Sequence, residues 1–348
     1  MFRSTILIEN RIVSKTSPVF IIAEAGVNHN GNIKLAKEMI DVAVEAGVDA
    51  VKFQSFKTDK LILPSIEKAP YQKITTSSTE TQSDMLKKLE LTREQTKELM
   101  DYCRRKNIIF ISTPFEKMSL DELYELGVPA FKIAATDLTN IQFLRQVAEK
   151  GKPIILSAGM CYLEEVQRAL ETIYPINKDV ILLHCTANYP INDSEANINV
   201  IRTFQETFDI LVGYSDHSQG VGASPYAVAI GAKVIEKHFT LDQNMEGPDH
   251  KASVTPDELR QLVLDIRRVE KYLGDGIKMP SYSEQMTRKS LQKCLVASAE
   301  IRRGELFTTN NIVAKRTNGN GISALYYDEV INRTANRDFH VDDIIDCT

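Results

Sequence analysis

A repeated strand–helix unit restricts this chain to few folds. Short apolar runs, each typical of a buried strand, occur near residues 19–24, 50–54, 108–113, 130–134, 153–157, 180–186, 210–214 and 234–239. Amphipathic helices, such as 35–47 and 93–106, separate most of them, and strands follow one another at mostly 22 to 31 residues. That spacing fits one β-loop-α-loop unit, and strands that are apolar throughout indicate a sheet covered on both faces. Eight units in succession predict an α/β fold, a closed (β/α)₈ TIM barrel.

The segments outside this repeat complete the predicted organisation. Residues 4–14 alternate around a central Glu-Asn pair and indicate a hairpin. The long interval between the second and third strands is polar and turn-rich, so we expect a loop over the barrel mouth. The alternative fold, a doubly wound open sheet, would want a GxGxxG loop after its first strand, and GVNHNG does not match that pattern.

The chain divides into a large and a small domain. The barrel domain with its N-terminal hairpin is expected over residues 1–280, a linker over 281–289, and a second domain of short strands and turns over 290–348. About sixty residues are few for an independent domain. We therefore expect the second domain to lean on the barrel or on a second subunit.

The composition excludes several classes of protein. Of the 348 residues, 43% are hydrophobic and 26% charged, which predicts an ordinary globular core. The net charge of -5 argues against nucleic acid or an anionic membrane surface as the main partner. Five scattered cysteines without CxxC spacing fit free thiols in a reducing compartment. There is no apolar run of about 20 residues that could cross a membrane, and we expect a cytoplasmic protein.

Polar residues gather where the predicted strands end. Active sites of such barrels lie at the C-terminal ends of the strands, so these residues are the candidate site. They are Glu24, Lys52, Gln54, Thr113, Lys132, Asp137, Ser157, Tyr189, Ser215, His217, Glu236, His238 and Asp249. Five of the six histidines in the chain fall at these ends or in the loops that follow.

His217 and His238 stand at matching ends of neighbouring strands, each close to a carboxylate in the sequence. Neighbouring parallel strands are about 4.8 Å apart, so two imidazoles at one height can share a metal ion. A histidine on one strand alone is more often a structural residue. Two imidazoles with carboxylates and water suit Mn²⁺, Fe²⁺, Co²⁺ or Zn²⁺ better than Mg²⁺ or Ca²⁺.

Lys52 and Lys132 project from strands that are otherwise apolar. A buried ammonium group is costly unless it is paired. An anionic ligand would pair with both lysines, whereas the alternative is a structural ion pair with Glu24 or Glu236. A metal ion polarises a carbonyl oxygen, so an anion site beside such an ion indicates an enzyme that makes or breaks carbon–carbon bonds.

A family resemblance runs along nearly the whole chain. It is carried, in order, by IAEAGVNHNG, AVKFQ, FISTPF, FKIA, ILSAGM, HCTANYP, GYSDH, EKHFT, GPDHKAS and the closing KR…GNGIS. Together these motifs resemble the sialic acid (N-acetylneuraminate) synthase family, which includes legionaminate synthases. The resemblance implies a barrel followed by a small antifreeze-like (SAF, β-clip) domain. It also implies condensation of phosphoenolpyruvate with N-acetylmannosamine to a nine-carbon 2-keto acid, with a divalent metal ion, usually Mn²⁺.

The resemblance assigns roles to the candidate residues. His217 and His238 would be the metal ligands, and Glu24 and Glu236 the acid–base carboxylates. The remaining positions would bind the two substrates: phosphoenolpyruvate at Lys52, Thr113, Lys132 and Ser157, with Ser215 beside them, and the sugar at Gln54, Tyr189 and Asp249. In the family an arginine of the partner's antifreeze-like domain reaches the N-acetyl group. Here that residue is Arg316, which implies a homodimer.

Three departures from the family pattern concern the sugar side. The usual Ser-Gly-Glu after the strand-four lysine is Ala135-Thr136-Asp137, where Asp137 can still accept a sugar hydroxyl. The asparagine that often follows HCT is Ala187, and the KRPGNG turn is expanded after Arg316. The alternatives to an N-acetylneuraminate synthase are an N,N'-diacetyllegionaminate synthase that uses 2,4-diacetamido-2,4,6-trideoxy-mannopyranose, a pyruvate-dependent metal aldolase, and an inert binding protein.

Overall fold

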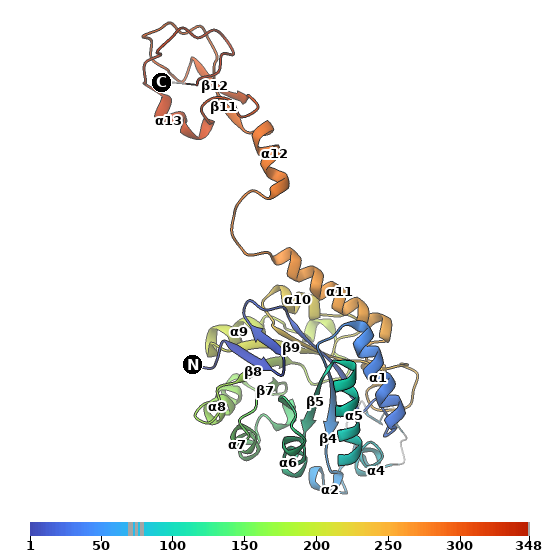
Figure 1. Cartoon of the computed structure of the whole chain (residues 1–348). Helices are drawn as coiled ribbons and strands as arrows, with labels where there is room; N and C mark the ends of the chain where they lie inside the picture. The colour runs from blue at the N-terminus through green and yellow to red at the C-terminus, as the bar shows by residue number, and fades with distance from the viewer. Residues whose placement is uncertain (69–71, 74–75, 77–79, 347–348) are drawn as a thin grey trace. The chain divides into compact units, whose positions relative to one another are not determined.

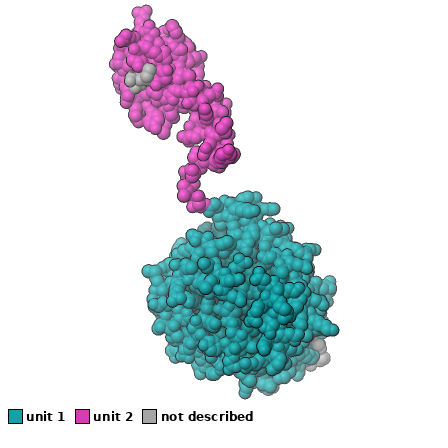
Figure 2. Space-filling model, viewed as in Figure 1, with its two compact units in different colours: residues 1–274 teal, residues 275–348 magenta. Residues whose placement is uncertain are grey.

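The computed structural model describes the chain except residues 69–71, 74–75, 77–79 and 347–348. It contains two compact units, Met1–Gly274 and Asp275–Thr348 (Figure 2). Each unit has a hydrophobic core of its own, so each is described by itself.

Unit 1 is the predicted parallel barrel (Figure 1). Within the described residues, eight strands close in the order β10-β3-β4-β5-β6-β7-β8-β9. These strands are β3 (Phe20–Gly26), β4 (Ala50–Ser55), β5 (Ile109–Pro114), β6 (Phe131–Ile133), β7 (Ile154–Ala158), β8 (Val180–Cys185), β9 (Leu211–Asp216) and β10 (Val234–His238). The surrounding helices are α1 (Ile33–Ala46), α5 (Arg93–Lys106), α6 (Lys117–Leu126), α7 (Ile141–Glu149), α8 (Leu163–Ile173), α9 (Val200–Phe208), α10 (Ser224–Ala229) and α11 (Pro256–Leu273). The closed strand order excludes the open-sheet alternative.

Local sequence signals set the helix boundaries. The α5 helix begins at a capping box in which Thr92 and Gln95 bond each other's backbone N–H groups, and it ends at Asn107 in the left-handed region. Helix α1 likewise ends at Gly47, with φ of 79°. No helix in the described ranges is both long and apolar enough to span a membrane.

Alternation along the strands separates the outer core from the barrel interior. Outward residues such as Ile21, Val51 and Ile235 belong to the cluster that packs beneath the helices. Inward residues near the strand starts, such as Phe20 and Ala50, form a second apolar cluster. Because side chains alternate with a period of two, the inward positions further along each strand remain available for the polar groups of a site.

The N-terminal hairpin lies against the interior of the barrel. Its strands are β1 (Thr5–Ile8) and β2 (Arg11–Ser14), which confirms the prediction. Ile6, Ile8 and Val13 are buried in the same cluster as the inward residues near the strand starts. This packing fills the N-terminal end of the barrel and leaves the opposite end as the place for a cavity.

In the described part of the excursion between β4 and β5 there are two short helices, α2 (Thr58–Leu61) and α4 (Gln82–Lys87). The predicted long loop is thus partly helical, and its residues 69–71, 74–75 and 77–79 lie outside the described residues. Its far end is packed closely on the loop after β3, since a Cβ on Gly31 would be 2.3 Å from the carbonyl oxygen of Lys88. Its side chains line the barrel mouth, as predicted.

Unit 2 contains an antiparallel pair, β11 (Lys293–Ala297) and β12 (Ile312–Arg316). The helices α12 (Tyr282–Leu291) and α13 (Tyr327–Val330) belong to it as well. The predicted linker over 281–289 is mostly helix: Ser281 and Glu284 form a capping box that starts α12. The division between the units falls after Gly274, a few residues before the expected end of the barrel domain.

Candidate active site

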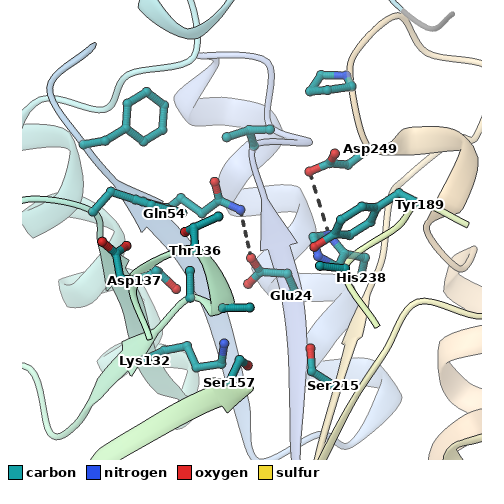
Figure 3. Close-up of a pocket in the computed structure, with 18 of the residues that line it drawn as sticks. Glu24, Gln54, Lys132, Thr136, Asp137, Ser157, Tyr189, Ser215, His238 and Asp249 are labelled. Atoms are coloured by element: carbon teal, nitrogen blue, oxygen red, sulfur yellow. Dashed lines mark hydrogen bonds and ion pairs between the residues drawn. The ribbon is translucent and has the colours of Figure 1, made fainter. Parts of the chain in front are cut away.

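A cavity of about 630 Å³ opens at the C-terminal ends of the barrel strands (Figure 3). This volume is typical of a site for small molecules, roughly 300–1,000 Å³. Every barrel residue that the sequence analysis proposed for the site lines this cavity. These residues are Glu24, Lys52, Gln54, Thr113, Lys132, Asp137, Ser157, Tyr189, Ser215, His217, Glu236, His238 and Asp249.

Lys52 is buried between two carboxylates. Its Nζ lies 2.8 Å from Glu24 Oε2 and 3.7 Å from Glu236 Oε2, and it donates to Thr113 Oγ1 at 3.0 Å. Burial disfavours the ammonium, but the two carboxylates outweigh this and raise the pKa of Lys52. Lys52 therefore stays charged and is held by the ion pairs that the sequence offered as its structural alternative.

Glu236 is the shared counter-ion of both buried lysines. Lys132 Nζ lies 3.4 Å from Glu236 Oε1, which also accepts from Ser215 Oγ at 2.9 Å. Burial opposes ionisation of Glu236, yet Lys132 and Lys52 together hold its pKa below the ordinary value. Two lysines thus share Glu236, and Lys52 is paired with Glu24 as well.

For Glu24 and Lys132, burial outweighs the ion pairs, so their pKa values shift toward the neutral forms. Burial raises the pKa of Glu24, and Lys52 offsets this only in part. Burial also lowers the pKa of Lys132 against the attraction of Glu236. Gln54 Nε2 donates to Glu24 Oε1 at 3.2 Å (Figure 3). Of the two carboxyl groups that pair with Lys52, Glu24 is therefore the one that can exchange a proton near neutral pH.

His217 and His238 face each other with ring centroids 5.5 Å apart. His217 Nδ1 lies 2.7 Å from the Thr186 carbonyl oxygen, so it carries the proton and leaves Nε2 as a lone-pair donor. Burial lowers the pKa of His217 to about 4 and that of His238 well below its ordinary value. Both rings are neutral imidazoles, the form that ligates metals.

The two imidazoles supply only part of the ligand set of a divalent metal ion, so water or substrate must fill the other coordination positions. His238 Nδ1 is buried without a hydrogen-bond partner among the described residues, and Asp249 Oδ2 is 3.9 Å away, beyond hydrogen-bond reach. Throughout the described ranges, no three His, Cys, Asp or Glu side chains converge as a complete ligand set. Two imidazoles can hold an ion whose other positions are filled by water or substrate.

Tyr189 and Asp249 lie beside His238 (Figure 3). The Tyr189 ring centroid is 4.1 Å from that of His217 and 5.4 Å from that of His238. Burial raises the pKa of Asp249 to about 6. Across the cavity, Asp137 follows β6 in a 3₁₀ turn, Ala135–Asp137, and burial raises its pKa to about 6 as well.

Several cavity residues were not singled out from the sequence. Cys185 ends β8, and burial raises its pKa to about 12, which keeps the thiol neutral. Its inward position could have been found from strand alternation, because Leu183 two residues earlier is inward. The others follow the strand ends or belong to the β4–β5 excursion: Val27, Phe56, Leu61, Ile62, Gln72, Gln82, Met85, Leu86, Phe115, Met160 and Pro248. The sequence signal that could have identified the residues of the β4–β5 excursion was the presence of apolar side chains in an otherwise polar segment.

Other polar groups at the strand ends do not line the cavity. His184 turns outward and hydrogen-bonds the Ala196 carbonyl oxygen at 2.9 Å. Lys237 pairs with Asp216 at 3.1 Å, with both side chains fully buried. Arg316 is exposed at the end of β12 in unit 2, so its predicted contact with a sugar stays a prediction.

The barrel and the titratable groups in its cavity define an enzyme. The NeuB family model matches residues 39–278, and the SAF domain model matches residues 292–346. The chain therefore belongs to the NeuB family, the sialic acid synthases, and ends in a SAF domain.

Three similar proteins illustrate the breadth of the family. The chain is 46% identical to the N,N'-diacetyllegionaminic acid synthase of Campylobacter jejuni, over 93% of this chain and 98% of that protein. The Legionella pneumophila enzyme of the same name is 42% identical over 87% and 86%. A crystal structure of N-acetylneuraminic acid synthetase from Leptospira borgpetersenii, in complex with citrate, has a TM-score of 0.73 and 36% identity, covering 84% of this chain and 98% of that one.

Proposed function

We propose that this enzyme condenses phosphoenolpyruvate with a 2-acetamido mannose-type sugar and releases phosphate and a nine-carbon 2-keto acid. The observation that carries the proposal is the placement of two buried ammonium groups and two neutral imidazoles around one cavity. The ammonium groups suit a carboxylate and a phosphate on the same small substrate.

The anion would lie at the deep end of the cavity. Lys132, Ser157 and Ser215 come together there (Figure 3). Ser157 Oγ is buried and has no hydrogen-bond partner among the described residues. A buried hydroxyl without a partner costs free energy, and an oxygen of the anion would accept its proton.

The cofactor that the donor set suits is a divalent metal ion, Mn²⁺ in the first instance. His217 and His238 would hold it, and Tyr189 and Asp249 beside them would orient the bound sugar. When bound, the ion would act as a Lewis acid on the sugar's aldehyde oxygen. Neutral imidazoles make this site sensitive to acid, because protonation removes the lone pairs.

The two carboxylates have different tasks in this proposal. Glu236 stays ionised and keeps both lysines charged and in place. As C3 of phosphoenolpyruvate forms its bond to the sugar's aldehyde carbon and the aldehyde oxygen takes up a proton, Glu24, with its raised pKa, would take a proton from the water that adds to C2. The resulting tetrahedral carbon then loses phosphate by C–O cleavage and becomes the ketone of the product.

The acceptor is either N-acetylmannosamine or a 2,4-diacetamido-2,4,6-trideoxy sugar. The first was the leading expectation from sequence, and the second is supported by the name of the 46% identical Campylobacter jejuni relative. Both acceptors place an aldehyde carbon next to an acetamido group, and the same anion and metal positions serve both.

The quaternary arrangement belongs to the same proposal. We expect a homodimer in which the SAF domain of one subunit brings Arg316 to the sugar in the other subunit's barrel. Arg316 is exposed at a strand end and bordered by a turn with Asn318 and Gly319 in the left-handed region. It is therefore presented at the surface of unit 2, where it can reach a ligand held elsewhere.

Phosphate release tests the proposed function. The purified protein should release phosphate from phosphoenolpyruvate only with a 2-acetamido sugar present, and EDTA should abolish the reaction until Mn²⁺ is restored. His217→Ala and His238→Ala should each lower kcat at least about 10³-fold and weaken Mn²⁺ binding. A pyruvate aldolase would instead work with pyruvate and release no phosphate, and an inert binding protein would show neither reaction.

A further inference from the structure

One part of the cavity lining is apolar, and the proposed chemistry does not use it. Phe56, Leu61, Ile62, Met85 and Leu86 all line the cavity. Four of them belong to one hydrophobic cluster, in which Phe56 and Met85 are buried and Leu61 and Leu86 are half-buried. We call these five residues the apolar wall.

The apolar wall lies at the outer end of the cavity. Lys52 is on β4, whereas Phe56 follows the end of that strand and the other wall residues come later in the β4–β5 excursion. At about 3.3 Å per residue along a strand, Phe56 is roughly 13 Å further along than Lys52. Whatever touches the wall is therefore not the anion held by the deep lysines.

The wall also faces Tyr189 and His217 across the mouth. In the closed strand order, β4 and β5 stand opposite β8 and β9. Tyr189 and His217 follow β8 and β9, whereas the wall residues all come from the segment between β4 and β5. A sugar whose aldehyde carbon is next to His217 would therefore extend its last carbons toward the wall.

From this placement we propose that the apolar wall selects the acceptor by the substituents on its outer carbons. It favours a sugar that carries a methyl group at C6 and an acetamido group at C4 over one with a hydroxymethyl group and a free hydroxyl. This inference rests on the proposed function and names the substrate class within it.

The physical reason is the difference between burying a methyl group and burying a hydroxyl. When the C6 methyl group of the sugar packs against Leu61 and Leu86, its transfer out of water is favourable. A hydroxyl in the same place loses its water and finds side chains that cannot accept or donate a hydrogen bond. The polar groups at this end, Gln72 and Gln82, are joined by a hydrogen bond of 3.1 Å, and such amides suit an acetamido group.

The direct test needs no mutation. We would measure kcat/KM for phosphate release with N-acetylmannosamine, its 6-deoxy analogue, and 2,4-diacetamido-2,4,6-trideoxymannose. We expect kcat/KM to increase in that order, about tenfold or more from each sugar to the next, since apolar pockets discriminate such groups by about 10- to 200-fold. A ratio at or below one between the 6-deoxy analogue and N-acetylmannosamine would overturn the proposal.

Two variants tie the preference to the wall. Leu61→Asn and Leu86→Asn put an amide where the outer carbons lie, and each should lower the preference for the deoxy sugars about tenfold. Leu264→Asn, at a 60% exposed leucine on α11, is the matched control and should leave the preference unchanged. Circular dichroism would establish that each variant is folded. If an asparagine variant did not fold, Leu61→Met would be measured instead, and this apolar replacement should keep the preference for the deoxy sugars.

The outcomes separate the inference from the proposed function. Phosphate release with any of the three sugars upholds the function. The proposed role of the apolar wall would be contradicted if the kcat/KM ratios between the sugars were unchanged in folded Leu61→Asn and Leu86→Asn. Loss of the preference in Leu61→Met would contradict it as well. Absence of phosphate release with every sugar, in the presence of Mn²⁺, would contradict the function itself.

Discussion

Glu236 and Glu24 both contact Lys52, but they are not equivalent. Glu236 is also the counter-ion of Lys132 and accepts from Ser215. Glu236→Gln leaves two buried ammonium groups with one carboxylate, so we expect destabilisation by about 3–5 kcal/mol. Glu24→Gln should cost clearly less, because burial already favours the neutral form of Glu24.

Urea unfolding at pH 7.5 would compare these two variants with Glu94→Gln, an exposed position in the first turn of α5. Equal losses in Glu24→Gln and Glu236→Gln would contradict the asymmetry. If Glu24→Gln remains folded and loses turnover, its role lies in the reaction rather than in holding the lysines.

Asp249 predicts a conflict between stability and activity. Burial raises its pKa from 3.8 to about 6, so the folded state binds a proton more tightly than the unfolded state. Stability therefore falls as the pH rises from about 4 to 6, and the cost is fully present above that window. Asp249→Asn cannot ionise and should stabilise the protein at pH 7.5 by up to about 3 kcal/mol, with much less gain at pH 4.5.

Thermal unfolding at both pH values checks the sign of this effect. Loss of stability at pH 7.5 would mean that the carboxylate of Asp249 is paired in the folded protein. The same variant should lose activity, because an amide cannot replace the charge of the carboxylate beside His238.

The strands β9 and β10 approach each other closely at Gly213. A Cβ there would lie 2.4 Å from the Val234 carbonyl oxygen and 2.5 Å from Leu183 Cδ2. Gly213→Ala must therefore displace the strand that carries Glu236 and His238. We expect destabilisation by about 3 kcal/mol and a marked loss of kcat.

Gly127→Ala is the control for this substitution. Gly127 ends α6 with φ of 82°, and no atom lies within 4 Å of the point where alanine would place its methyl group. Its cost is therefore the left-handed backbone alone, about 1–2 kcal/mol. Thermal unfolding and phosphate release would be measured on both variants. Similar stability losses, or an unaffected kcat in Gly213→Ala, would contradict the packing argument.

The barrel strands were predictable because each is a continuous apolar run, and every predicted strand lies within a few residues of an observed one. Alternation also explains which polar residues share the cavity. Lys52 and Gln54 are two residues apart and both inward, as are Glu236 and His238. Lys237 lies between the latter two and turns outward to Asp216.

The β4–β5 excursion was less predictable for a physical reason. Its short helices α2 and α4 have too few turns to show a periodicity, and the local sequence signal is the Thr81–Asp84 capping box that starts α4. The close approach of Gly31 to Lys88 depends on the fold. Leu61 and Leu86 lie 25 positions apart in the sequence and meet in one cluster only through the fold. Sequence could place a segment over the mouth, but not its apolar surface.

At the scale of the whole molecule, the two units have independent cores. Leu295, Phe307 and Phe339 are fully buried within unit 2, whereas the barrel cavity is lined by residues of unit 1. The family resemblance placed Arg316 in a partner's site, and this cannot follow from contacts within one chain. It requires an experiment that distinguishes a contribution within a subunit from one between subunits.

Co-expression of two inactive variants makes that distinction. Lys52→Ala disables the barrel, and Arg316→Ala disables the contribution of unit 2. If Arg316 acts on the partner's barrel, a mixed dimer contains one site with both residues intact, and random pairing in a symmetric dimer restores about one quarter of the wild-type sites. If Arg316 acts within its own subunit, every site carries one lesion and activity is not restored.

The measurement is phosphate release by protein purified through two different affinity tags, one on each variant, which isolates the mixed dimers. Tagged Lys52→Ala paired with a second copy of itself is the matched control and should be inactive. About half of the wild-type rate per mixed dimer supports the exchange between subunits. A mixed dimer without activity would contradict it, because Arg316 would then act on the barrel of its own chain. If Arg316 had no part in catalysis, Arg316→Ala paired with a second copy of itself would remain active, so that pairing is the second control and should be inactive.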